Sequence, residues 1–140
     1  MVFERILVPL DATPVDDAVL AVVEDLATAL GSEVVLLRVA HYHTRDTKAH
    51  EVEDAEEHLA AAAARLRDKG FAVREVVAHG EPAQAIVAQA AELGADLIAL
   101  ATHGHGTLTR MVMGSVADAV RHSTRVPLLL VKGGPADEKG

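Results

Sequence analysis

Residues 96–115, DLIALATHGHGTLTRMVMGS, decide the fold of this 140-residue chain and contain its candidate site. The stretch opens with an apolar run, Leu97 to Leu100, that is typical of a strand buried on both faces of a parallel sheet. Gly104 and Gly106 follow, and because neither has a Cβ, the backbone there can take positive φ and approach a ligand closely. The stretch therefore predicts a buried strand and then a loop that exposes several backbone amides.

The end of the same stretch predicts the start of a helix. Gly114 and Ser115 precede a helical pattern that includes Val116 and Val120, and Asp118, three residues after Ser115, completes an N-cap arrangement. Unpaired amides and the macrodipole make a helix start favourable for anions, so loop and helix together predict a cradle for a di- or triphosphate. The same residues also fit a plain turn and helix cap, which is their commoner use.

Five apolar runs alternate with four helical patterns along the chain, which predicts an α/β fold with a parallel sheet and helices on both faces. The predicted strands cover residues 6–10, 34–39, 71–78, 97–100 and 126–131. The helices are predicted to start at Pro14 after a Thr13 cap, after an exposed connection at 41–48, at Pro82 and after Ser115, and to end near Gly31, Gly70, Gly94 and Ser123.

Strand order decides which loops meet, and the pattern alone does not fix it. Arg74 and Glu75 make the third strand less apolar than the others, which favours a position at or near an edge. We expect a three-layer doubly wound fold with a five-stranded sheet of order 3-2-1-4-5, in which strands 1 and 4 flank the switch point. Ligands bind beyond the carboxyl ends of the strands at such a point, so residues 9–13 should face residues 101–106.

Composition argues against several classes of function. The formal net charge of -8 disfavours general binding to nucleic acid, which depends on clustered Lys and Arg. Cysteine is absent, which removes disulfides, thiolate catalysis and Cys-based metal sites and fits a cytoplasmic protein. The start, MVFERILVPLD, has charges ahead of a short apolar run, so we expect neither a signal peptide nor a membrane span. We expect one domain at residues 1–132 and a flexible tail at 133–140.

No catalytic motif competes with the phosphate cradle. The sequence contains no P-loop, no dinucleotide fingerprint after the first strand and no nucleophile elbow. His41, His43, His103 and His105 follow two predicted strands, but their spacing is no recognised zinc pattern, and we expect no metal centre there. Because no base, nucleophile and orienting group occur together, a binding or regulatory module is favoured over an enzyme.

Nearly the whole chain resembles the universal stress protein family, through the segments ILVPLD, LLRVA, GEPAQAI, ADLIALATHG, MGSVADAV and VPLLLVK. The ATP-binding signature of that family is glycine, two residues, glycine, nine residues, and then glycine followed by serine or threonine. Gly104 and Gly114-Ser115 fall at this spacing, whereas Ala101 occupies the place of the first glycine. The methyl group of Ala101 either crowds a bound ribose or is harmless if φ is negative.

The resemblance implies ATP as the ligand, with Mg²⁺ or Mn²⁺ held mainly by the phosphates and water. It implies that Asp11 contacts the adenine, and it assigns the lining of the base and ribose pocket to Pro9, Leu10 and Val39. The phosphates would lie against Gly104, Gly114, Ser115 and Val116, and His103 would shape their loop. Two residues have another interpretation, because Asp11 also fits a turn or cap and Val39 also fits ordinary core.

By the same resemblance, the chain would be an ATP-binding regulator or sensor of the stress response, acting on an unknown downstream protein. A slow ATP-hydrolysing switch, or an interaction protein with the fold but without the nucleotide, are the alternatives. The run VPLLLVK predicts an apolar strand at a sheet edge, whose unpaired backbone groups a second copy could satisfy about a twofold axis. We therefore expect a homodimer through Val126 to Lys132, which the resemblance also implies.

Overall fold

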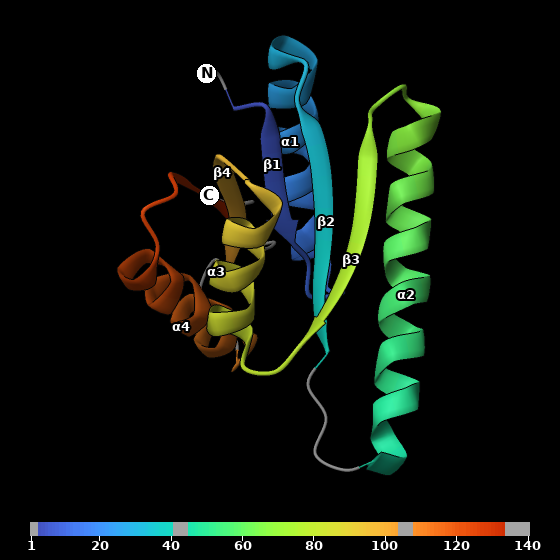
Figure 1. The fold of residues 1–140 in the computed structure, drawn as a ribbon, viewed down its shortest axis with the longest axis vertical. Helices are drawn as coiled ribbons and strands as arrows, with labels where there is room; N and C mark the ends of the chain where they lie inside the picture. The colour runs from blue at the N-terminus through green and yellow to red at the C-terminus, as the bar shows by residue number, and fades with distance from the viewer. Residues whose placement is uncertain (1–2, 41–44, 104–107, 134–140) are drawn as a thin grey trace.

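The computed structural model describes the backbone of residues 3–40, 45–103 and 108–133, and their side chains except at 45–49, 51, 103, 108–115 and 133. Its elements are β1 (Arg5–Pro9), α1 (Val15–Leu30), β2 (Glu33–Ala40), α2 (Arg45–Asp68), β3 (Val73–His79), α3 (Pro82–Leu93), β4 (Leu97–His103), α4 (Leu108–Ser123) and β5 (Leu128–Gly133). All strand pairs are parallel, in the order β3-β2-β1-β4-β5 (Figure 1). The predicted fold class and strand order are confirmed.

The sheet separates two hydrophobic cores. Ile6 and Val8 of β1 pack with residues of α1 and α2 on one face, whereas Leu7, between them, packs with residues of α3 and α4 on the other. This alternation follows from the period of two along a strand. Figure 1 shows α3 in front of the sheet and α1 behind it. The central strand is therefore covered on both faces, which is why its sequence is continuously apolar.

Polar contacts tie four strands together at the amino end of the sheet. Glu33, at the start of β2, contacts Arg5 of β1 (2.6 Å) and Arg74 of β3 (3.2 Å). The Asp96 carboxylate, just before β4, accepts hydrogen bonds from the backbone N–H groups of Glu4 and Arg5 (2.9 and 3.0 Å). We call these five residues the amino-end cluster. It lies at the opposite end of the strands from the edge where a ligand is expected.

Helix ends follow the sequence signals to within one residue in α1 and α3. Gly31 and Gly94 have φ of 71° and 68°, the left-handed conformation expected just past a helix end. The start of α1 is a correction, because the helix begins at Val15 and Pro14 precedes it. The reason is a tighter first turn, closed by the hydrogen bond from Asp16 N to Thr13 O (2.9 Å).

The start of α4 was predicted wrongly. The helix begins at Leu108, so Gly114 and Ser115 lie within it and Ser115 is not its N-cap. The physical reason is visible in the sequence, where apolar residues recur every four positions over a longer stretch than was predicted, at Leu108, Val112, Val116 and Val120. A glycine inside a helix costs about 1 kcal/mol relative to alanine, which this apolar stripe can offset.

Other boundaries differ from expectation for local reasons. Helix α2 begins at Arg45, so the second half of the connection predicted at 41–48 is helical, and residues 41–44 lie outside the described part. Strand β3 begins at Val73 and lies at a sheet edge, as Arg74 and Glu75 indicated. Strand β5 begins only after Pro127, which has no N–H for the ladder but accepts a hydrogen bond from Ile98 N (3.0 Å).

Candidate functional site

The sheet opens at its switch point. The ladder between β1 and β4 consists of two residue pairs, Ile6 with Leu97 and Leu7 with Ile98. On the other side of each strand the pairing continues, as far as Pro9 with Leu37 and His103 with Gly133. The carboxyl ends of β1 and β4 are therefore free of each other, at the place where a doubly wound fold binds its ligand.

The predicted pocket residues on β1 and β2 divide between the two cores. Pro9 is buried, and Leu10 is buried in the core under α1 and α2 while its N–H donates to Leu37 O (2.8 Å). Val39 is half-buried and packs against the core on the opposite face, under α3 and α4. The structure therefore does not bring the Leu10 and Val39 side chains together. Val39 fits the ordinary core interpretation as well as a pocket wall.

Ala101, in the place of the family glycine, has its methyl group in a core. The residue is 3% exposed and belongs to the same cluster as Leu10, on the α1 and α2 face. Among the described residues, positive φ at a non-glycine position occurs at Phe3 and Ala12, so Ala101 has the negative φ of an ordinary strand residue. The methyl group therefore packs without backbone strain.

The predicted phosphate ligands are described only in part. Val116 is 9% exposed and packs in the core under α3 and α4. His103 ends β4, and Gly114 and Ser115 lie within α4, but their side-chain surroundings are outside the described part, as is Gly104 altogether. His41, His43 and His105, which were considered with His103 for a metal, also lie outside it. Among described residues, no cluster of three metal-binding side chains occurs.

Asp11 shapes the β1–α1 loop. Its Oδ1 accepts hydrogen bonds from Thr13 N (3.1 Å) and Thr13 Oγ1 (2.6 Å), which is the turn role that its position after a strand also allowed. The next residue, Ala12, has φ of 65°, an unusual value for a residue with a Cβ. The loop is therefore held in a conformation that its sequence alone does not favour.

Asp16 holds this loop from below and was not predicted as a site residue. It is 6% exposed, and its carboxylate accepts hydrogen bonds from Asp11 N (3.0 Å) and Ala12 N (2.9 Å). His58 Nε2 of α2 lies 3.2 Å from Asp16 Oδ2, and His58 Nδ1 lies 3.0 Å from a guanidinium nitrogen of Arg38 on β2. We call Arg38, His58 and Asp16 the loop-anchoring network. A sequence signal existed, because Asp16 lies between Val15 and Val19 on the buried face of a predicted helix.

Burial perturbs both titratable members of the network. Burial and, to a smaller extent, the nearby Asp11 charge raise the pKa of Asp16 to about 6, against the opposing effect of the Asp11 and Ala12 N–H groups. Burial also lowers the pKa of His58, and the neighbouring positive charges of Arg38 and Arg65 act in the same direction. Asp16 therefore titrates at about pH 6, in the first turn of the helix that follows the Asp11 loop.

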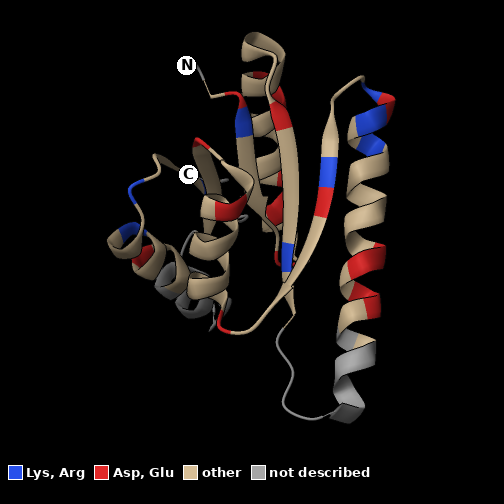
Figure 2. Ribbon diagram, viewed as in Figure 1, with Lys and Arg blue, Asp and Glu red and all other residues tan. Residues whose placement is uncertain are grey.

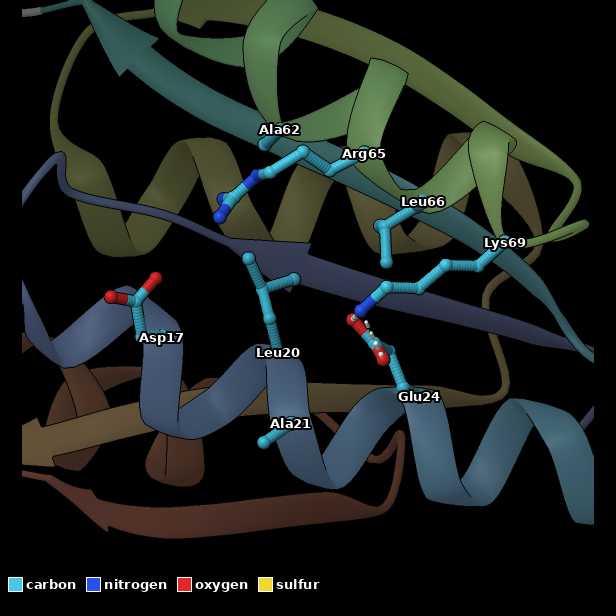
Figure 3. Close-up of a pocket in the computed structure, with 8 residues that line it drawn as sticks. All are labelled: Asp17, Leu20, Ala21, Glu24, Ala62, Arg65, Leu66 and Lys69. Atoms are coloured by element: carbon cyan, nitrogen blue, oxygen red, sulfur yellow. Dashed lines mark hydrogen bonds and ion pairs between the residues drawn. The ribbon is translucent and has the colours of Figure 1, made fainter.

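A separate cavity of about 240 Å³ lies between α1 and α2 (Figure 3). Leu20, Ala62 and Leu66 are among its apolar lining residues, and the ion pair between Lys69 and Glu24 (3.0 Å) crosses it. Figure 2 shows acidic residues along the middle of α2 and basic residues near its carboxyl end, where the helix dipole favours positive charge. This cavity lies between helices and not at the carboxyl edge of the sheet, so its size does not make it the candidate ligand site.

The class of protein is defined by a doubly wound parallel sheet that opens at its switch point, with an aspartate loop at the opening. The chain belongs to the universal stress protein family, whose sequence model matches residues 3–132. No helix in the described ranges is long and apolar enough to cross a membrane.

Three relatives illustrate the similarity. Universal stress protein Rv2005c of Mycobacterium tuberculosis is 32% identical over 135 residues, which is 91% of this chain and 45% of that protein. The chain thus spans about half the length of this relative. The solved structure of MJ0577, a universal stress protein of Methanocaldococcus jannaschii, has a TM-score of 0.80 and 29% identity and covers 96% of this chain and 99% of that one. The universal stress protein from Archaeoglobus fulgidus in complex with dAMP has a TM-score of 0.74 and 24% identity and covers 94% and 100%.

Proposed function

We propose that this protein binds ATP with Mg²⁺ or Mn²⁺ at the carboxyl edge of β1 and β4 and acts as a regulator or sensor in a stress response. The observation that carries the proposal is the opening of the sheet between Pro9 and the end of β4, next to the Asp11 loop. A family relative of the same fold is described in complex with dAMP, which supports an adenine nucleotide as the class of ligand.

In this proposal the adenine lies against the Asp11 loop, and the phosphates lie over the segment from Gly104 to Val116. No cluster of three metal-binding side chains occurs among the described residues, so the cation would be held by phosphate oxygens and water. The protein's contribution is then to orient the base and to offer backbone amides to the phosphates.

Regulation is preferred to catalysis because the residues of the opening bind and shape rather than react. In the described part of the opening, the Asp11 carboxylate already accepts two hydrogen bonds from Thr13, which gives it a role in the shape of the loop. Slow ATP hydrolysis and a role without nucleotide are the alternative functions. A cytoplasmic location and an unknown downstream protein belong to the same proposal.

A homodimer through β5 completes the proposal. Leu130, on this edge strand, is 46% exposed and is the exposed large hydrophobic residue of the described part. Its neighbours Leu129 and Val131 pack against the core under α1 and α2. An edge strand with one outward leucine and unpaired backbone groups favours pairing with a second copy of itself.

Two measurements test the nucleotide. Mass spectrometry of the small molecules released from purified, denatured protein should show an adenine nucleotide. Calorimetry of nucleotide-free protein with ATP and MgCl₂ should show saturable binding, and GTP should bind more weakly. If millimolar ATP and MgCl₂ give neither heat nor a rise in melting temperature, ATP is not the ligand and the interaction-protein alternative is favoured.

A further inference from the structure

The Asp16 carboxylate connects three elements around the β1–α1 loop. From its place in the first turn of α1, it accepts two backbone N–H groups of the loop and faces His58 of α2, which in turn contacts Arg38 of β2. Because the carboxylate is nearly inaccessible to water, these contacts are strengthened by the low local dielectric. The loop that they hold carries Asp11.

Hydrogen-bond chemistry fixes the protonation state of this arrangement. A guanidinium can only donate, so His58 Nδ1, at 3.0 Å from Arg38, must be the acceptor and carry no proton. The imidazole is then neutral with its proton on Nε2, and that N–H donates to Asp16 Oδ2. Three donors therefore converge on the Asp16 carboxylate, and they bind it most strongly when it is ionised, because hydrogen bonds to a charged acceptor are about twice as strong as neutral ones.

We propose that Asp16 is a positioning residue for nucleotide binding, and that uptake of a proton by its carboxylate releases the β1–α1 loop and weakens the binding. This inference rests on the proposed function of the opening between β1 and β4. It adds a residue outside the ligand's reach and a condition, acidic pH, under which the site would loosen.

A proton arriving at the network has two possible positions with opposite consequences. On His58 Nδ1 it would face the Arg38 donors and expel them, while the imidazolium would bind Asp16 more strongly and keep the loop in place. On Asp16 it would remove the negative charge and leave a hydroxyl oxygen, which is a poorer acceptor, so that the contacts to Asp11 N, Ala12 N and His58 Nε2 weaken. Only the second position releases the loop.

The groups around the pair favour the carboxylate as the position of the proton. Asp11 faces Asp16 from the loop with a like charge, and Arg38 on β2 and Arg65 on α2 act on His58 with like charges. Together with burial, these charges raise the pKa of Asp16 to about 6 and lower that of His58. Ala12, at φ of 65°, has a strained backbone that would relax when its N–H is released.

The loop itself provides a test that needs no nucleotide. In ¹H–¹⁵N spectra of the wild type between pH 4.5 and 8, the Asp11 and Ala12 amides should shift together with a midpoint near 6. In Asp16→Asn both shifts should be absent, whereas the matched variant Asp17→Asn, an exposed neighbour on the same turn, should retain them. Should Asp16→Asn fail to fold, His58→Gln serves instead, because it keeps a donor toward Asp16 and should move the midpoint without abolishing the step.

Amides of Asp11 and Ala12 that do not titrate, or that titrate unchanged in Asp16→Asn, would overturn the inference whether or not ATP binds.

Calorimetry with ATP and MgCl₂ tests the effect on nucleotide binding, and comparison of variants at the same pH cancels the titration of the ATP phosphates. At pH 7.5 we expect Asp16→Asn to bind about 5- to 10-fold more weakly than Asp17→Asn, as for the loss of one hydrogen bond of ordinary net strength. At pH 5 the two affinities should agree within twofold, and an equal ratio at both pH values would contradict the proposal. Absence of binding by the wild type at pH 7.5 would reject the proposed function alone.

Discussion

His58 Nε2 lies 3.2 Å from Asp16 Oδ2, which joins the middle of α2 to the first turn of α1 beneath the candidate ligand loop. The two residues have opposite effects on the pH dependence of folding. The native pKa of Asp16 is raised from 3.8 to about 6, so its stabilising contribution is complete below pH 3.8 and is lost as pH rises through 6. The native pKa of His58 is lowered from 6.5, so its contribution is present above 6.5 and is lost as pH falls.

We therefore predict that Asp16→Asn becomes more stable relative to the wild type as pH rises from 4 to 6.5. The change in the difference between their free energies of unfolding should be on the order of 1–3 kcal/mol, because a pKa shift of one unit corresponds to about 1.4 kcal/mol. Denaturant titrations at four pH values measure it. Asp17→Asn is the control, and a difference that does not vary with pH would show that Asp16 is not buried as an ion.

Replacing Ala12 with glycine should stabilise the protein. A residue with a Cβ at φ of 65° costs about 1–2 kcal/mol, and glycine removes that cost while adding some entropy to the unfolded chain, so we expect a net gain of about 0.5–1 kcal/mol. Thermal or denaturant unfolding measures the gain. Ala21→Gly, on the exposed face of α1, should instead destabilise by about 1 kcal/mol. A loss in Ala12→Gly would mean that the strain is absent in solution.

Glycine should stabilise the protein at Ala12, whereas we expect it to destabilise the protein at Ala101. Its methyl group is buried among core residues, so Ala101→Gly should lower the free energy of unfolding by about 1–2 kcal/mol, from lost burial and a more flexible strand. Because the methyl group lies in the core, we expect ATP affinity to stay within twofold of the wild type. A large gain in affinity would show that the methyl group crowds the ribose after all.

Gly114→Val should weaken ATP binding more than it weakens folding. Gly114 lies inside α4, where valine is no worse a helix former than glycine, so we expect the free energy of unfolding to change by less than about 1 kcal/mol. A branched side chain in the segment proposed to hold the phosphates should reduce ATP affinity at least tenfold. Ala119→Val, on the exposed face of the same helix, is the control. Equal losses in binding and stability would make Gly114 a packing residue.

The proposed dimer is best tested at Leu130. Leu129 packs against the core, so Leu129→Arg would damage the fold, whereas Leu130 is exposed and Leu130→Arg should separate the subunits without unfolding them. Light scattering should give a dimeric mass for the wild type and for Ala88→Arg on the exposed face of α3, and a monomeric mass for Leu130→Arg. A monomeric wild type at micromolar concentration would exclude the dimer.

The fold was predictable because its signals are local. Continuous apolar runs such as Leu97 to Leu100 and the glycines after α1 and α3 act within a few residues, and each lies where the structure has a strand or a helix end. The start of α4 differs from the prediction because Gly114 and Ser115 favour a boundary by residue type, whereas the spacing from Leu108 to Val120 indicates one longer helix. A packed apolar stripe can override one unfavourable residue.

The candidate site was predictable only in part, because its side chains meet through tertiary contacts. Asp11 could be singled out from its place after a strand, but the partners of Asp16 lie on β2 and α2, and no local pattern links them. Leu10 and Val39 were both assigned to one pocket, yet they pack on opposite faces of the sheet. Alternation places Leu10 on the same face as Val8, but the strand register that places Val39 on the opposite face is set by tertiary pairing and is not visible in the sequence.

The amino-end cluster makes the two ends of the sheet unequal in their resistance to fraying. Arg5, Glu33, Arg74 and Asp96 connect four neighbouring strands there, whereas the other end loses the ladder between β1 and β4 after Leu7. Local opening starts where hydrogen bonds between neighbours are fewest. Transient separation of the strands should therefore begin beside the proposed nucleotide site and stop before the amino end. A ligand bound there would hold β1 and β4 together where their ladder ends and would slow this local opening.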